Sequence, residues 1–125
     1  MIKNIASIGG DSRQKYTIKK LVEFGYRVDD LDVLDDNISF YDAFILPLPV
    51  STDGIYINSA KITIAEFLKK INEKQIVFVG KADEKLKKQL EQKGNVCADY
   101  YLRDEFALKN AEPTALGVLL FVMNN

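Results

Sequence analysis

The sequence of 125 residues contains no histidine and no tryptophan, and its only cysteine is Cys97. Without an imidazole, the chain lacks the side chain that most often serves as a general base or metal ligand near neutral pH. A lone cysteine can form neither an internal disulfide nor a Cys-x-x-Cys site. We therefore expect no bound zinc or other metal. Because free cysteines are usually buried, Cys97, between Val96 and Ala98, is expected to be a small core residue.

Long apolar runs and an excess of positive charge are also missing. The longest apolar run, Ala115–Met123, is far shorter than the roughly 20 residues that cross a bilayer, and Met1-Ile2-Lys3-Asn4 does not resemble the start of a signal peptide. With 17 Lys and Arg against 18 Asp and Glu, the net charge is −1, so little surplus positive charge is available for a phosphate backbone. These features predict a cytoplasmic protein that binds neither membranes nor nucleic acid.

The sequence does contain alternating apolar strands and amphipathic helices. Its 47% hydrophobic and 28% charged residues are typical of a globular protein, and its length fits one domain, 1–125. We expect strands at 4–8, 26–28, 43–46, 76–79 and 96–101, and helices between Gly10 and Gly25 and at 63–71, 83–93, 103–109 and 114–123. This order predicts a flavodoxin-like three-layer α/β/α sandwich with a doubly wound parallel sheet of about five strands.

Local signals set several of these boundaries. Gly25 and Gly94 are placed to end helices in the left-handed conformation, and Thr63 with Glu66 matches a capping box. The acidic run Asp29–Asp36 lacks the glycine and terminal glutamate of a calcium-binding loop. We expect this run to form a solvated loop, because like charges repel one another and remain in water.

The stretch around Gly9-Gly10-Asp11-Ser12-Arg13 organises the rest of the chain. A strand is followed by two glycines, a polar helix cap and an arginine, which is the order of a strand, a tight turn and a helix start. Outward-facing amides at such a start attract anions. Arg13 opposes the helix dipole there, which favours a ligand-binding role. The alternative is that the glycines and Asp11 serve only as a turn and a cap.

In a doubly wound sheet, ligands bind beyond the carboxyl ends of the strands, where the strand order reverses. This rule places residues 9–13, 47–54 and 80–83 along one edge. The turn lacks the third glycine of a dinucleotide fingerprint and is not a phosphate-binding P-loop, so we expect no dinucleotide to bind. Leu46-Pro47 stands where a phosphoacceptor domain would need aspartate, and only Ser12 is available for a flavin phosphate.

Three stretches together resemble a known family: Ile8–Gln14, Ile45–Pro49, and Asn110 with Pro113–Ala115 and Gly117. Their order, over nearly the whole chain, resembles the N-terminal domain of the A subunit of dipicolinate synthase from spore-forming bacteria. The resemblance implies a D-2-hydroxyacid dehydrogenase architecture, with a flavodoxin-like first domain and a second, Rossmann domain that holds NADP. It also implies that the whole enzyme, with a second synthase subunit, oxidises a dihydrodipicolinate-type precursor to dipicolinate during sporulation.

The resemblance implies a substrate site but names no catalytic residue. Leu116 occupies the position at which the family pattern Pro-Thr-Ala-Glu-Gly has glutamate, so any role of that carboxylate is lost. The nucleotide-binding half is absent, and the chain is therefore expected to be a cut-out first domain or a stand-alone relative that binds no cofactor and does not catalyse alone. The expected substrate-binding residues are Gly9, Gly10, Asp11, Ser12, Arg13, Pro49, Ser51, Asn110, Thr114 and Ala115.

Two functions of different classes follow. In the first, the chain is the substrate-side half of an NADP-dependent oxidoreductase, in which Arg13 and the Gly9–Ser12 amides hold a dicarboxylate while the missing half supplies hydride chemistry. In the second, it is a non-catalytic module for small-carboxylate binding or for the assembly of subunits. The segment Thr114–Met123 is apolar on nearly all sides, so we expect it to pack against a second domain or, in a homodimer, a second copy. Burial within its own monomer is the alternative.

Overall fold

The computed structural model of the chain describes residues 2–10, 12–34, 37–47, 49–79 and 84–99. The helices expected at 103–109 and 114–123 lie outside this range. The elements in chain order are β1 (Asn4–Ile8), α1 (Ser12–Glu23), β2 (Arg27–Leu31), the 3-10 helix η1 (Ile38–Phe40), β3 (Ala43–Ile45), α2 (Ile64–Lys70), β4 (Ile76–Val79), α3 (Glu84–Lys93) and β5 (Val96–Asp99).

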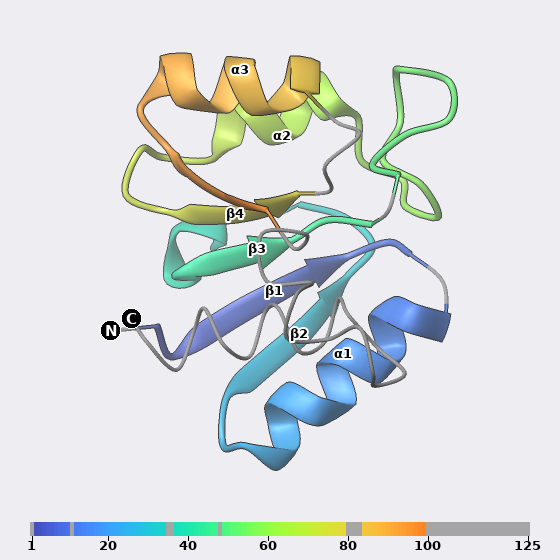
Figure 1. Ribbon diagram of the computed structural model, residues 1–125, viewed down its shortest axis with the longest axis vertical. Coiled ribbons are helices and arrows are strands. Elements are labelled where there is room, and N and C mark those ends of the chain that lie inside the picture. The colour runs from blue at the N-terminus through green and yellow to red at the C-terminus, as the bar shows by residue number, and fades with distance from the viewer. Residues whose placement is uncertain (1, 11, 35–36, 48, 80–83, 100–125) are drawn as a thin grey trace.

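The strands form one five-stranded sheet in the order β2-β1-β3-β4-β5 (Figure 1). Every neighbouring pair is parallel. The chain leaves β1 for β2 on one side and then returns to β3 on the other side, so the winding reverses between β1 and β3. This is the flavodoxin-like strand order, and it confirms the predicted doubly wound sheet.

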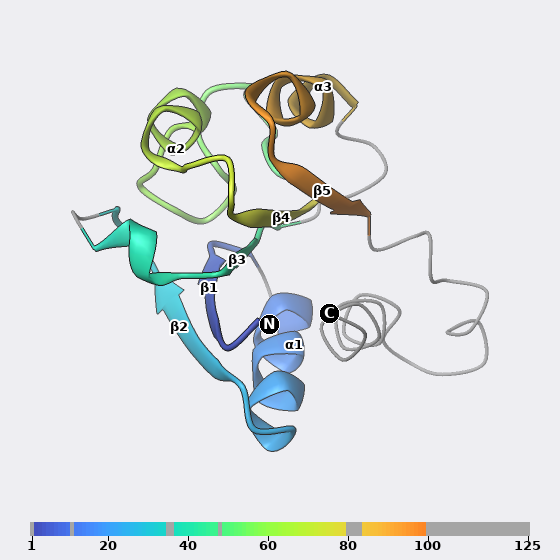
Figure 2. The ribbon, with the colours of Figure 1, turned by 90° about the vertical axis from the view of Figure 1, so that its left-hand side faces the viewer.

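Helices cover both faces of the sheet, with α1 on one face and α2 and α3 on the other (Figure 2). Ile45 and Phe78 belong to the apolar core on the α1 face, together with Leu21. Phe44, the neighbour of Ile45 in β3, belongs to the opposite core and meets Phe67 of α2 edge to face at 5.3 Å between ring centroids. Successive strand residues thus enter opposite cores, which explains why these strands are continuously apolar.

The expected helix boundaries at Gly25 and Thr63 are confirmed. Gly25 has φ +93°. Its N–H donates to the carbonyl of Val22 at 3.0 Å, and the N–H of Tyr26 donates to that of Leu21 at 3.1 Å, closing α1 with the bond pair of a Schellman motif. At the start of α2, the hydroxyl of Thr63 accepts a hydrogen bond of 3.0 Å from the N–H of Glu66, which satisfies an otherwise unpaired helix donor.

The expected boundary of β2 is wrong. Residues 29–31 were expected in a solvated loop, but Asp29 and Asp30 continue the strand opposite Ala6 and Ser7 of β1. Because β2 is an edge strand of the sheet, an acidic side chain here can remain near water. Asp29 also accepts a hydrogen bond of 2.8 Å from the hydroxyl of Tyr41, a partner that lies outside the acidic run.

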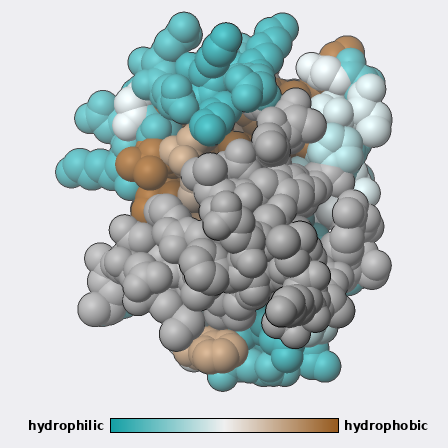
Figure 3. All heavy atoms as spheres, in the orientation of Figure 1, coloured by the Kyte–Doolittle hydropathy of each residue, from teal (hydrophilic) through white to brown (hydrophobic). Residues whose placement is uncertain are grey.

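The surface of α3 is hydrophilic, and Figure 3 shows such side chains gathered over this end of the molecule. Lys85, Lys88 and Lys93 are exposed and Lys87 is half-buried, as expected for a solvated helix face. Cys97 is half-buried and packs against the core beneath α2 and α3. In the described ranges, no helix combines the length and hydropathy needed to span a bilayer.

Candidate functional site

The candidate site lies at the carboxyl edge of β1 and β3, where the winding reverses. Ser7, near the end of β1, is in register with Ile45, the last residue of β3. The turn at Gly9 and Gly10 and the loop that begins at Leu46 therefore leave the sheet side by side. This confirms the expected placement of these two stretches at one edge, whereas residues 80–83 lie outside the described range.

The glycine turn is in close contact with the loop after β3. Gly9 and Gly10 have φ +62° and +92°, a region that residues with a Cβ rarely adopt. A Cβ atom at Gly9 would overlap the carbonyl oxygen of Asn58, and the N–H of Gly10 donates to that same oxygen at 3.0 Å. The Gly10 N–H, one of the Gly9–Ser12 amides expected to hold a dicarboxylate, is therefore engaged within the chain.

Asn58 presents this oxygen because its other groups hold the loop together. Its backbone N–H donates to the carbonyl of Val50 at 2.7 Å, and its side-chain Nδ2 donates to the carbonyl of Pro49 at 2.9 Å. The hydroxyl of Thr52 donates to its Oδ1 at 3.3 Å. The sequence alone does not single out Asn58, because its role depends on contacts between separate parts of the loop and the first turn.

The tip of the loop is a compact polar turn around Asp53. Its Oδ1 accepts hydrogen bonds from the N–H groups of Ile55 and Tyr56 at 2.8 and 2.9 Å and from the hydroxyl of Ser51 at 3.0 Å. These bonds favour the charged form of Asp53 and therefore lower the pKa of its carboxyl. The bond from the N–H of Ile55 has the largest effect. Ser51 also accepts from the N–H of Gly54 at 2.9 Å, so its hydroxyl has a structural role in this turn.

Gln14 links β1 to β3 at the point where the winding of the sheet reverses, a role that the sequence analysis does not predict. Gln14 is 4% exposed. The Nε2 group donates to the hydroxyl of Ser7 and to the carbonyl of Ile45, both at 2.9 Å. A signal was present in the sequence, since Gln14, Thr17 and Leu21 have the spacing of one helix face and all three are buried.

The predicted site residues are only partly brought together within the described ranges. Gly9 and Gly10 contact Asn58, which in turn binds Pro49, whereas Ser51 lies in the Asp53 turn. Ser12 and Arg13 are the first two residues of α1, directly after the turn. Asp11, Asn110, Thr114 and Ala115 lie outside the described range. No group of three or more Cys, Asp or Glu residues among the described side chains is arranged to hold a metal ion.

Comparison with known proteins identifies similar sequences and folds. The sequence model of the family described as the N-terminal domain of the dipicolinate synthase A subunit matches residues 4–101. The crystal structure of the dipicolinate synthase A chain from Bacillus subtilis is similar at 20% identity with a TM-score of 0.65, covering 100% of this chain and 49% of that one. The dipicolinate synthase A subunit from Bacillus halodurans is similar at 24% identity with a TM-score of 0.62, covering 98% and 49%. No curated protein sequence matches.

Proposed function

The chain belongs to the family of N-terminal domains of the dipicolinate synthase A subunit, and we propose that it is the substrate-side half of an NADP-dependent oxidoreductase that makes dipicolinate during sporulation. The observation that carries the proposal is the family match over residues 4–101, which includes the whole reversal point between β1 and β3. The chain spans about half the length of the two solved structures, 49% of each. In this proposal the chain binds substrate and does not catalyse alone.

The proposed ligand is a small dicarboxylate held at the start of α1. The N-terminus of a helix carries a partial positive charge and backbone N–H groups without intrahelical partners. Ser12 and Arg13 occupy this first turn, and an arginine can pair with a carboxylate through two parallel hydrogen bonds. Because the N–H of Gly10 is engaged by Asn58, the proposal rests on the first turn of α1 rather than on the Gly10 amide.

The glycine turn of this chain does not fit a dinucleotide. The turn has two glycines where the fingerprint has three, and the carbonyl oxygen of Asn58 lies against Gly9 and Gly10, where a pyrophosphate would need free N–H groups. The NADP implied for the full-length family would therefore be bound by residues outside this chain. The remaining predicted contacts of the dicarboxylate are Asp11, Pro49, Ser51, Asn110, Thr114 and Ala115.

The proposal extends to partners and location. The Bacillus halodurans relative is described as the A subunit of dipicolinate synthase, and we propose that this chain, too, has a second synthase subunit for its partner. The segment Thr114–Met123, outside the described range, is proposed to contact a second domain or a second copy. The protein would act in the cytoplasm.

Binding of pyridine-2,6-dicarboxylate tests the proposal directly. The melting temperature should rise as the ligand concentration passes the dissociation constant, and pyridine-2-carboxylate, with one carboxylate fewer, should bind more weakly. Arg13→Ala should weaken dicarboxylate binding by about 1.5–3 kcal/mol, the value of a hydrogen bond to a charged group. Lys19→Ala, an exposed cation later in the same helix, is the matched control. Equal affinity of the Arg13 variant and wild type would refute the proposed site.

One observation favours the second candidate, a non-catalytic module for carboxylate binding or for the assembly of subunits. A Cβ atom would overlap Asn58 at Gly9 and Gln14 at Gly10, which gives both glycines a structural reason that needs no ligand. A folded chain that shows no thermal shift with either pyridine carboxylate would support the assembly role. A Gly-x-Gly-x-x-Gly strand-turn-helix encoded downstream of Asn125 would instead support the oxidoreductase half.

A further inference from the structure

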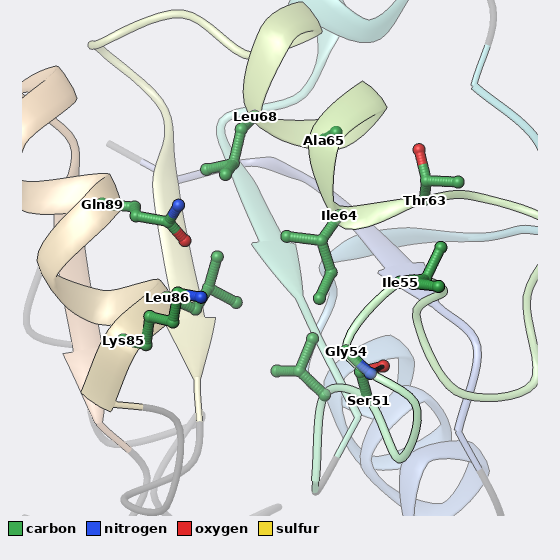
Figure 4. A pocket seen from close by; sticks show the side chains of 11 residues that line it. Ser51, Gly54, Ile55, Thr63, Ile64, Ala65, Leu68, Lys85, Leu86 and Gln89 are labelled. Carbon is green, nitrogen blue, oxygen red and sulfur yellow. Dashed lines mark hydrogen bonds between the residues drawn. The ribbon is translucent and has the colours of Figure 1, made fainter.

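A pocket of about 580 Å³ lies between α2, α3 and the loop after β3, on the face of the sheet opposite α1 (Figure 4). Its volume is within the range of small-molecule sites, about 300–1,000 Å³. Neither Gly9 nor Gly10 lines the pocket, although Ser51, a predicted contact of the dicarboxylate, does. Its apolar walls are formed mainly by Val50, Ile55, Ile64, Leu68 and Leu86.

Two polar side chains of α3 lie at the solvent-exposed rim of this pocket. Lys85 and Gln89 are four residues apart, so they share one face of the helix, and Figure 4 shows both pointing from α3 towards α2. Within the described part of the chain, neither side chain forms a hydrogen bond or an ion pair. None of the described residues that line the pocket is acidic. An ammonium group and an amide that have no partner among the described residues thus lie together at the rim of an apolar pocket.

The hydroxyl groups on the other side are engaged within the chain. The Ser51 hydroxyl donates to Asp53 and accepts from the N–H of Gly54, and the Thr63 hydroxyl caps α2 through the N–H of Glu66. Among the described lining residues, Lys85 and Gln89 therefore set the charge and hydrogen-bonding preference of the pocket. An anion is favoured at this position and a cation is disfavoured.

We propose that this pocket binds a small monocarboxylate with an apolar ring or acyl body. The carboxylate accepts hydrogen bonds from Lys85 and Gln89, and the apolar body lies against Ile64 and Leu68. A dicarboxylate does not suit this pocket, because its second charge would be removed from water against aliphatic side chains. The proposal is independent of dicarboxylate binding at Arg13.

An ¹⁵N–¹H correlation titration with 1-naphthoate, a ring with a single carboxylate, tests the proposal. The probe should saturate with a dissociation constant below about 1 mM, with the largest shifts at Ile55, Ile64, Leu68 and the side-chain amide of Gln89. The neutral analogue 1-naphthalenemethanol should bind about tenfold or more weakly, because it lacks the charge that pairs with Lys85. Absence of saturation at about 1 mM, or shifts centred elsewhere, would overturn the proposal.

Variants separate the pocket from general surface charge. Lys85→Glu should weaken 1-naphthoate binding about tenfold or more, and Leu68→Trp should abolish it by filling the cavity. Lys88→Glu makes the same charge change at an exposed position of α3 that does not line the pocket, and it should change affinity by less than about twofold. Equal losses from the two glutamate variants would contradict the proposal. Chemical shifts of the same residues that change with protein concentration in the absence of 1-naphthoate would show that a second copy occupies the pocket. That result would also overturn the proposal.

Discussion

The carbonyl oxygen of Asn58 accepts a hydrogen bond of 3.0 Å from the N–H of Gly10 and occupies the space in which a Cβ atom at Gly9 would lie. This contact joins the turn after β1 to the loop after β3 at the point where the winding of the sheet reverses. It also places a carbonyl oxygen, rather than a free N–H, at the glycine turn. The Gly10 N–H is therefore engaged, and the proposed dicarboxylate site rests on the first turn of α1.

Gly9→Ala should destabilise the fold more than an ordinary glycine substitution. Alanine is strained at φ +62° and would also overlap the backbone of Asn58, so we expect a loss of about 2–4 kcal/mol in the free energy of unfolding. Gly54→Ala is the matched control, since φ is +78° but nothing lies within 4 Å of the added Cβ; its expected loss is about 1 kcal/mol. Urea denaturation measures both, and equal losses would show that the Asn58 contact is unimportant.

Gln14→Glu should make stability depend on pH. The substituted oxygen would face the carbonyl of Ile45, where Nε2 now donates, so burial and this repulsion would raise the pKa of the introduced carboxyl in the folded state. The variant should lose about 3 kcal/mol or more near pH 7. Because the folded-state pKa lies above the unfolded value, stability should recover as pH falls below the folded-state pKa and the group is protonated.

The control for this variant is Gln92→Glu, at an exposed position of α3. Its free energy of unfolding should change by no more than about 0.5 kcal/mol. Chemical denaturation of both variants between neutral and mildly acidic pH gives the comparison. A Gln14 variant whose loss is independent of pH would mean that the introduced carboxyl reaches water.

Asp53 should titrate below the ordinary aspartate range. The N–H groups of Ile55 and Tyr56 and the hydroxyl of Ser51 all donate to its charged form and lower the pKa of the carboxyl. Because the folded-state pKa is depressed, the stabilising effect of these bonds is present above the ordinary aspartate pKa and is lost as pH falls through the folded-state pKa. Carbonyl ¹³C NMR measures this titration. Ser51→Ala should raise the pKa of Asp53 part of the way back, and a wild-type pKa at or above 3.8 would contradict the turn geometry.

The chain should not bind NADPH. The Asn58 carbonyl at the glycine turn would repel a pyrophosphate and already accepts the Gly10 N–H, and the third glycine of the fingerprint is missing. Isothermal titration calorimetry should give no dissociation constant tighter than about 100 μM, which corresponds to roughly −5.5 kcal/mol. Tighter binding would mean that another part of the chain accommodates the nucleotide.

The sequence predicted the elements whose signals are local. A left-handed glycine at residue 25 and the Thr63 hydroxyl act within a few residues of the helix ends that they close. The continuously apolar residues of β3 and β4 predict strands buried on both faces, which requires helices on both sides and hence a doubly wound sheet. The placement of residues 9–13 and 47–54 at one edge follows from the same topology.

Only the tertiary structure decided the features that depend on contacts between distant segments. Asp29 and Asp30 join β2 because they pair with β1 at an open edge, a position that the acidic composition of this stretch does not reveal. Gln14 is buried because its amide meets Ile45, and the Gly10 N–H faces inward because the loop after β3 returns Asn58 to it. Hydrophobic periodicity and helix capping are encoded by a few neighbouring residues. The partner of a buried polar group is instead fixed by how the whole chain packs.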